Sequence, residues 1–426
     1  MDIELAYGDK KLNIDIDDNN LLDVATLEDV KPVQDPEKKV AESLYDPIGS
    51  KPIDAIISPG KKICIVISDI TRAVPTKLIL KVLLAELARL NIDKDDITIL
   101  IATGLHRPNL GEELIALVGK EVSEQYRIIN HYARRLDTCR AIGKTKSGTP
   151  VILDKTYLDA DIKILTGLIE PHFMAGFSGG RKAICPGISY MDMFKHFHGP
   201  DILESPYASV GVLKNNPFHM ESTEIAKMAG VDFIINVTID KEKRITGIFA
   251  GDLEEAFVKG AGFCLSNSSY NISGEADIVV TTGGGLPLDA TLYQAVKGMV
   301  GALPAVKKDG MIIIASECRE EIGSDEFIEL VTEEKDLDLF MEKIKDKSYF
   351  KIDQWELEEF VKARKKADIY LYSSCMLNST FDIPSSSLIV IDSIDKGLEI
   401  GFERFGKNAK VTVIPEGPYC IPILKK

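Results

Sequence analysis

Residues 63–72 read ICIVISDITR, and this stretch decides the fold class of the chain. Its first five residues, Ile63 to Ile67, are apolar without interruption, which is typical of a strand buried on both faces of a parallel sheet. The polar residues that follow predict a loop, and the apolar spacing from about Thr76 to Leu90 then predicts a helix. A buried strand followed by a helix is the repeating unit of α/β proteins.

The same alternation of strands and helices continues along the chain. In the first half we expect further strands at 97–102, 162–166, 233–238 and 245–249, and a helix at about 253–265. In the second half we expect strands at 277–281, 311–315, 368–372 and 388–391, with helices at 290–305, 325–346, 356–367 and 396–405. This order predicts an α/β fold whose sheets are mostly parallel and flanked by helices.

The length of 426 residues is too great for one hydrophobic core, so we expect two α/β domains. The stretch 266–274, SNSSYNISG, is polar and rich in turn residues, which predicts a link between them. The N-terminal domain is therefore placed at 1–268 and the C-terminal domain at 275–426. Within the first domain, residues 1–60 are expected to form short strands and turns.

The composition excludes several classes of partner. A formal net charge of −15 argues against binding to nucleic acid or to an anionic membrane surface, since both require a basic face. The N-terminus lacks the basic and apolar regions of a signal peptide, and no apolar run is long enough to span a membrane. The seven cysteines are scattered without a CxxC pair, which disfavours disulfides and thiolate zinc sites. The cytoplasm is the expected compartment.

Reactive side chains follow the predicted strands at the ends where α/β proteins bind ligands. Asp69 and Arg72 follow the first strand, His106 the second and His172 the third, while Gln294 and Lys297 follow the first strand of the second half. Taken singly, each has an ordinary interpretation as a helix terminus, a loop histidine or a solvated lysine. Their joint placement favours an active site in a cleft between the two domains.

The segment 173–186, FMAGFSGGRKAICP, contains a glycine-rich turn with two cations. Ser178, Gly179, Gly180 and Arg181 offer backbone N–H groups and a positive charge that suit a phosphate, although the spacing is not that of a Walker loop. The alternative is a mobile glycine turn with solvated cations. Lys182 lies between these glycines and an apolar run, and a partly buried lysine is available as a nucleophile for covalent attachment.

Two histidines follow this segment, at positions 196 and 198. Residues two apart on a helix point to nearly opposite sides, so both are not expected to hold the same metal ion. His198 precedes a Gly–Pro helix stop, and one imidazole suits a single position on nickel or zinc. The other ligands would have to come from elsewhere. His131 and His219 are interpreted as structural or surface residues.

Together these motifs resemble those of the nickel-pincer lactate racemases, and the similarity extends over nearly the whole chain. The residues that carry it are Asp69–Arg72, Gly104–Pro108, Glu170–Phe173, Ser178–Lys182, His196–His198 and Tyr293–Lys297. The resemblance implies a nickel-bearing cofactor, pyridinium-3-thioamide-5-thiocarboxylic acid mononucleotide, attached covalently to Lys182. It further implies that His198 is the protein ligand of nickel.

The resemblance also implies the reaction, which is the interconversion of D- and L-lactate through hydride transfer and a bound pyruvate intermediate. Removal of the α-hydrogen as hydride avoids placing negative charge beside the carboxylate, while a base takes the hydroxyl proton. Each enantiomer needs its own base, and His106 and His172 are the expected pair. Arg72 is expected to hold the carboxylate.

The remaining roles implied by the resemblance are supporting ones. Gln294 and Lys297 would hold substrate or intermediate, and Asp69 would orient a neighbouring side chain. Because the chain cannot make this cofactor itself, cofactor-assembly enzymes are implied as partners.

Three alternatives stay open. The first is racemisation or epimerisation of another 2-hydroxy acid by the same chemistry. The second is an NAD-dependent dehydrogenase, which is disfavoured because no GxGxxG motif follows a strand with an acidic residue about twenty positions later. The third is a non-catalytic nickel-binding protein, which leaves Arg72, His106 and His172 unexplained.

Overall fold

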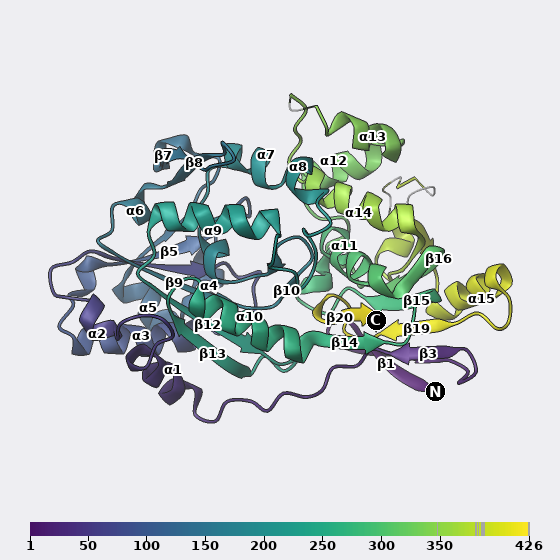
Figure 1. Cartoon of the computed structure of the whole chain (residues 1–426), viewed down its shortest axis with the longest axis horizontal. Coiled ribbons are helices and arrows are strands. Elements are labelled where there is room, and N and C mark those ends of the chain that lie inside the picture. Colours follow the sequence, from purple (N-terminus) through teal and green to yellow (C-terminus); the bar gives the residue numbers. More distant parts are fainter. Residues whose placement is uncertain (347, 380, 382, 385–387, 425–426) are drawn as a thin grey trace. The chain divides into compact units, whose positions relative to one another are not determined.

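The computed structural model describes residues 1–424 apart from 347, 380, 382 and 385–387. The chain divides into two compact units (Figure 1). Unit 1 comprises Met1–Glu28, Pro171–Phe173 and Asn267–Lys426, and unit 2 comprises Asp29–Glu170 and Met174–Ser266. Each contains a six-stranded sheet. The predicted α/β class, with two domains and mostly parallel sheets flanked by helices, is confirmed.

The sheet of unit 2 has the strand order β13-β12-β9-β4-β5-β6, and only β13 runs antiparallel to its neighbour. The strands are β4 (Ile63–Ser68), β5 (Ile97–Ala102), β6 (Arg127–Asn130), β9 (Ile162–Leu168), β12 (Phe233–Ile239) and β13 (Ile245–Gly251). The strands predicted in this half all lie within these elements. Their continuous apolar runs occur because both faces of the sheet are buried.

Helix α3 (Thr76–Arg89) covers one face of this sheet, with Leu80 and Leu83 in the same buried cluster as Ile65 and Ile99. Burial of one such leucine contributes about 1.5–3 kcal/mol. The other helices are α1 (Pro36–Tyr45), α2 (Ile53–Ile56), α4 (Gly111–Val118), α5 (Lys120–Gln125), α6 (Lys155–Leu158), α7 (Phe194–Phe197), α8 (Pro200–Leu203), α9 (Pro217–Ala229) and α10 (Glu255–Ser268). A separate hairpin consists of β7 (Cys139–Lys144) and β8 (Pro150–Asp154).

The prediction of only strands and turns over residues 1–60 is wrong for α1 and α2. The side chain of Asp35 accepts a hydrogen bond from the backbone N–H of Lys38, and Pro36 occupies the first helical turn. Both are helix-start signals. Val40 and Leu44 of α1 are then fully buried.

The sheet of unit 1 is parallel throughout, with the order β18-β17-β16-β15-β19-β3. The strands are β3 (Leu21–Val24), β15 (Ala276–Thr282), β16 (Val306–Ala315), β17 (Ala367–Tyr372), β18 (Ile389–Ile391) and β19 (Val411–Ile414). The strands predicted in this half are confirmed apart from Leu388, which precedes β18. Smaller strands of the unit are β1 (Asp2–Tyr7), β2 (Lys10–Asp15), β10 (Pro171–His172), β14 (Ser269–Ile272) and β20 (Ile421–Leu424).

Alternate residues of these strands point to two different apolar layers. Val279 and Ile312 pack with helices α11 (Leu292–Gly301), α12 (Asp325–Glu333), α13 (Leu337–Lys343) and α14 (Gln354–Lys366). Val280 and Ile313 pack on the opposite face with the hairpin β1–β2 and with α15 (Ile394–Phe405). Within the described residues, every helix is too short or too polar to cross a lipid bilayer.

The expected domain limits differ from these units in three places, one of which is Pro171–Phe173, expected in the first domain but part of unit 1. Residues 1–28 lie with the C-terminal half, because β3 pairs with β19 and the β1–β2 hairpin covers a face of the same sheet. The expected link 266–274 is instead the end of α10 and strand β14, which pairs with β20. Its polar residues tolerate this position because most of them are partly exposed.

Candidate active site

Asp69 and His106 meet at one edge of the sheet in unit 2. Strands β4 and β5 are parallel neighbours, and their last residues, Ser68 and Ala102, are paired in register. The loops that follow therefore start side by side. Nδ1 of His106 lies 2.6 Å from Oδ2 of Asp69.

This pair combines a buried carboxylate with an accessible imidazole. Asp69 is only 3% exposed, whereas the His106 side chain is 39% exposed. Burial acts to raise the pKa of Asp69, but the His106 hydrogen bond and the charges of His106 and Arg72 outweigh it, so this pKa is lowered. The hydroxyl of Thr71 also donates to the carboxylate at 2.6 Å. Asp69 is thus an ionised acceptor that orients the His106 ring and directs Nε2 away from itself.

Arg72 completes this cluster mainly through its charge. Its backbone N–H donates to the carbonyl of Asp69 at 3.2 Å, and its half-buried side chain acts on the carboxylate electrostatically. The neighbouring Arg107 instead forms a bidentate salt bridge with Glu113, with N–O distances of 2.6 and 2.7 Å. Arg72 is therefore the cation of this edge that suits a small carboxylate.

Lys182 and His198 meet at a second place in unit 2, on the ring of Phe218. Nζ of Lys182 lies 5.4 Å from the centroid of this ring, and the His198 ring lies 5.2 Å from it in an edge-on arrangement. Lys182 belongs to a short 3-10 helix, Gly180–Ala183, while His198 follows α7 and Phe218 opens α9. The fold thus joins residues sixteen and more positions apart in the sequence.

The surroundings of His198 keep its imidazole neutral. The side chain stacks on Phe194 at 5.3 Å and also contacts Phe197, and the residue is only 7% exposed. Burial lowers the pKa of His198 well below the ordinary histidine value, and the charge of Lys182 lowers it further. A neutral imidazole presents a nitrogen lone pair, which is the form that ligates a metal ion.

The glycine-rich turn next to Lys182 differs from the predicted phosphate cradle. The hydroxyl of Ser178 donates to the carbonyl of Leu168 at 2.9 Å, and the N–H of Gly180 donates to Oδ1 of Asn236 at 2.7 Å. Arg181 is 1% exposed, and its guanidinium donates to backbone carbonyls. These donors are used inside the protein, which argues against Ser178, Gly180 and Arg181 as the ligands of a phosphate, whereas Gly179 stays a predicted ligand.

The remaining predicted residues gather in unit 1. The His172 ring stacks on Phe173 at 5.1 Å, and Nζ of Lys297 lies 6.0 Å from the Phe173 centroid. Lys297 also donates a hydrogen bond to Oε1 of Gln294, one turn earlier on α11. Thr291 caps this helix by accepting from the N–H of Gln294. His172, Gln294 and Lys297 therefore form one polar group beside an aromatic ring.

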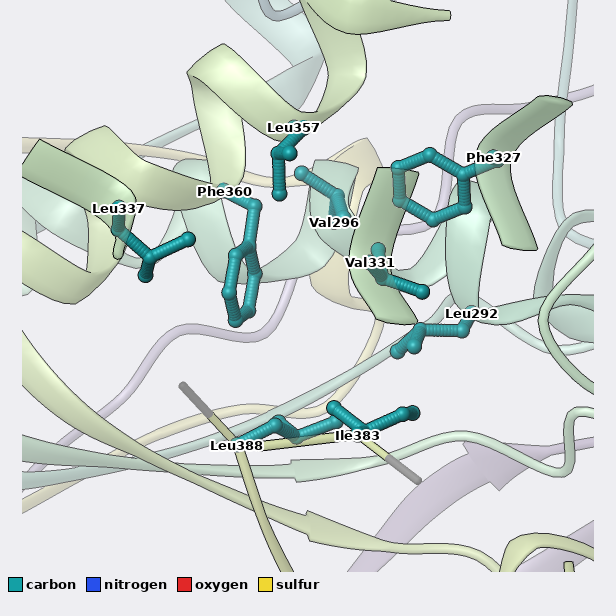
Figure 2. Close-up of a pocket in the computed structure, with 9 residues that line it drawn as sticks. All are labelled: Leu292, Val296, Phe327, Val331, Leu337, Leu357, Phe360, Ile383 and Leu388. Carbon is teal, nitrogen blue, oxygen red and sulfur yellow. The ribbon is translucent and has the colours of Figure 1, made fainter. Parts of the chain in front are cut away.

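An apolar pocket in unit 1 offers no chemistry of this kind. Figure 2 shows hydrocarbon side chains from α11, α12, α13 and α14 together with two that precede β18, Ile383 and Leu388; those from the helices are Leu292, Val296, Phe327, Val331, Leu337, Leu357 and Phe360. Among the described residues, no three His, Cys, Asp or Glu side chains are grouped so that they could hold a metal ion by themselves. His198 is therefore not part of a group of three such side chains within the described residues.

Contributors to these clusters that were not predicted from the sequence include Phe218 and Asn236. Phe218 lies at the start of α9, a helix that was not predicted although Asn216–Pro217 is a helix-start signal. Asn236 lies within a strand that was predicted, and it is fully buried there. An asparagine inside an apolar strand is a signal of a specific hydrogen bond, here to Gly180.

Comparison with known proteins then identifies the family. Residues 7–211 match the lactate racemase N-terminal domain, and residues 272–421 match the lactate racemase C-terminal domain. A lactate racemase of Thermoanaerobacterium thermosaccharolyticum is 34% identical over 423 residues, which cover 97% of each chain. The chain belongs to the lactate racemase family.

Further comparisons agree with this family. A lactate racemase of Lactiplantibacillus plantarum is 34% identical over 422 residues, covering 97% of this chain and 98% of the relative. The solved structure of the lactate racemase apoprotein from T. thermosaccharolyticum matches with a TM-score of 0.92 at 34% identity, and all of both chains is covered. A structural-genomics protein from Thermotoga maritima shares the fold, with a TM-score of 0.70 at 19% identity over 94% of this chain and 100% of that one. The family resemblance seen in the motifs is thus confirmed.

Proposed function

We propose that this protein is a lactate racemase that uses a nickel-bearing, nicotinate-derived mononucleotide joined covalently to Lys182. The observation that carries the proposal is the meeting of Lys182 and neutral His198 on the ring of Phe218. Membership in a family whose relatives are lactate racemases supports the substrate and the reaction.

These residues fit such a group on chemical grounds. A lysine nucleophile is needed for attachment, and a neutral imidazole is needed as a ligand for nickel. Phe194, Phe197 and Phe218 surround His198 with apolar surface, which favours the neutral ring over the imidazolium. In this proposal Lys182 holds the organic part and His198 is the protein ligand of the metal. When bound, the group supplies the capacity to accept and return the α-hydrogen of the substrate as hydride.

The other side chains transfer the hydroxyl proton of the substrate and bind its carboxylate. His106 accepts the hydroxyl proton at Nε2, because its Nδ1 is directed at Asp69. Asp69 stabilises the imidazolium that results, and its low pKa keeps it ionised for this purpose. His172 serves as the base for the opposite enantiomer. Arg72 binds the substrate carboxylate, and Gln294 and Lys297 bind the substrate through hydrogen bonds and charge.

Lactate is the proposed substrate because the relatives are lactate racemases. Another 2-hydroxy acid with the same α-hydroxy carboxylate would use the same residues, so the side-chain volume that the site accepts decides between them. A panel of single enantiomers of lactate, malate and an aryl lactate, followed by polarimetry, tests this choice. Lactate is expected to racemise fastest.

We also propose a compartment for the protein and the enzymes on which its activity depends. We place the protein in the cytoplasm, where its seven cysteines stay reduced, and we expect separate enzymes to assemble the cofactor. Protein produced without those enzymes is expected to fold but to be inactive. Activity in such protein without added cofactor would contradict the proposal.

The decisive experiment is the intact mass of protein co-expressed with the assembly enzymes. Wild type is expected to carry a mononucleotide-sized adduct with nickel, and Lys182→Ala is expected to lack it. Lys195→Ala is the matched control, because Lys195 is an exposed lysine of the nearby helix α7 and should leave the adduct unchanged. An unmodified wild type, in a system that loads a related racemase, would overturn the proposal.

A further inference from the structure

Arg181 is an unusual residue, because a guanidinium is seldom buried completely. It is 1% exposed and is the largest fully buried side chain among the described residues. Burial lowers its pKa to about 9, which reflects how unfavourable the charged form is in this environment. The face of Phe257 lies 4.2 Å from the guanidinium carbon and offsets part of this cost.

The guanidinium folds back on the backbone that leads up to it. Nη2 donates to the carbonyl of Ala175 at 2.8 Å, and Nη1 donates to the carbonyl of Phe177 at 2.9 Å. A longer contact of 3.3 Å joins Nη1 to the carbonyl of Gly179. A planar fork with several donors can hold three carbonyls at once, which a lysine ammonium on a flexible stem does less well.

Other buried side chains fix the same backbone from further directions. Asn216 donates to the carbonyl of Met174 at 2.9 Å, and Asn236 accepts from the N–H of Gly180 at 2.7 Å. Gly179 and Gly180 have φ values of +83° and +51°. A Cβ atom would lie 2.7 Å from Oδ1 of Asn236 at the first and 2.9 Å from Phe257 at the second. The turn is therefore packed tightly against the interior.

Lys182 follows this fixed turn directly. Its N–H donates to the carbonyl of Gly179 at 3.1 Å, so its backbone belongs to the same hydrogen-bonded unit. Its side chain extends from this turn toward Phe218. Attachment of a group to a lysine depends strongly on position, because a misplacement of about 1 Å can cost about 10²-fold in rate.

We propose that Arg181 is a positioning residue, whose buried guanidinium clamps the 175–179 backbone and thereby holds Lys182 beside Phe218 for cofactor attachment. The inference rests on the proposed function of Lys182 as the attachment point. It assigns Arg181 a role inside the protein rather than contact with the cofactor.

Hydrogen exchange on unloaded protein tests the clamp without any cofactor. In wild type, the amides of 176–185 are expected to exchange slowly, like those of β9. In Arg181→Met they are expected to exchange at least tenfold faster, while other peptides of unit 2 stay unchanged. Tyr157→Phe is the matched control, since it removes a hydrogen bond from another buried side chain to a backbone carbonyl, that of Gly230. Fast exchange of 176–185 in wild type would overturn the clamp even if Arg181→Met failed to fold.

The adduct fraction at Lys182 after co-expression then tests the consequence. Arg181→Met is expected to carry at least tenfold less adduct than Tyr157→Phe when the two variants have similar melting temperatures. Arg181→Lys keeps the charge but not the fork, and we expect less than a third of the wild-type adduct. Wild-type levels of adduct in either Arg181 variant would overturn the proposal. If wild type itself carried no adduct, the proposed function would fail, while the exchange data would still decide whether the clamp exists.

Discussion

Two histidines of unit 2 occupy opposite environments. His106 is partly exposed and hydrogen-bonded to a buried carboxylate, whereas His198 is buried among three phenylalanines with a lysine nearby. The carboxylate of Asp69 stabilises a positive charge on the first ring, and the apolar surroundings disfavour that charge on the second. The same side chain is therefore prepared for proton transfer in one place and for donation of a lone pair in the other.

The difference teaches that the surroundings of a histidine predict its chemistry better than the loop that carries it. Both residues follow regular elements, and neither belongs to a cluster of metal-binding side chains within the described residues. Substitution of His106 and substitution of His198 should therefore impair different functions, and this difference can be measured.

The largest effect is expected for His198→Phe. The new ring keeps a planar aromatic shape in an aromatic environment but removes the nitrogen ligand, so bound nickel should fall below a tenth of the wild-type amount and racemisation should become undetectable. Elemental analysis of the co-expressed protein measures this. The melting temperature is expected to change by less than about 5 °C.

His106→Gln provides the contrast to this variant. Nickel content and adduct mass should equal those of wild type, because His106 lies in the other environment. Loss of nickel in His106→Gln, or retention of nickel in His198→Phe, would contradict the assignment of His106 as the base and His198 as the nickel ligand.

The second effect is the activity of His106→Gln itself. Loss of a general base typically costs about 10²- to 10⁴-fold in rate. We expect kcat to fall about 10³-fold in the direction that uses His106, as followed by a coupled assay that consumes one enantiomer. A loss of less than tenfold in both directions would exclude His106 as a base.

A smaller effect is expected for Asp69→Asn. The amide removes the negative charge that stabilises the His106 imidazolium but retains an oxygen near Thr71, so activity should fall by about 10- to 100-fold, as it does for partners that orient a metal-ligating histidine. The split between kcat and KM separates this role from a structural one, since Asp69 acts through the hydrogen bond to His106 and should lower kcat with little change in KM. An unchanged kcat would leave Asp69 with a structural role only.

Much of the first environment could be predicted from the sequence. Strands β4 and β5 are long apolar runs, so the residues that follow them could be placed at one sheet edge, and Asp69 and His106 indeed make contact there. The second environment could be predicted only in part. Lys182 and His198 were singled out, but Phe218 comes from a helix whose place depends on long-range packing.

Arg181 shows why such limits exist. A glycine-rich turn with two adjacent cations has the composition of an anion site, and charged residues are almost never fully buried unless they are paired. Whether the guanidinium points outward or inward depends on the free carbonyls and on Phe257, which lies 76 residues later in the chain. No local sequence pattern identifies Phe257 as a neighbour of Arg181.

The smallest effect concerns His219, a partly buried histidine whose pKa is also lowered. Burial and the charge of Arg181 lower its pKa to about 3. Unfolded chain binds a proton at this residue near pH 6.5, whereas folded protein does not until about pH 3, so the free energy of unfolding should fall as the pH decreases below 6.5. The contribution is at most about 1.4 kcal/mol per pH unit.

Urea unfolding between pH 7 and pH 4.5 measures this slope. His219→Gln should reduce the slope by at most about 1.4 kcal/mol per pH unit, because buried His198 still contributes to it. His196→Gln, at an exposed position, should leave the slope unchanged. Equal slopes in wild type and His219→Gln would mean that His219 is protonated in the folded protein, and the contrast between exposed and buried histidines would then be limited to His106 and His198.

The pairing of β3 with β19 has a consequence for synthesis of the chain. Leu21–Val24 emerges from the ribosome long before its partner Val411–Ile414, so the sheet of unit 1 cannot be completed until residues 411–414 have been translated. Unit 2 is translated almost entirely in between and can fold first. The nascent chain thus carries strand β3 without a partner until Val411–Ile414 has been made, and a chain truncated before residue 411 cannot complete the sheet of unit 1.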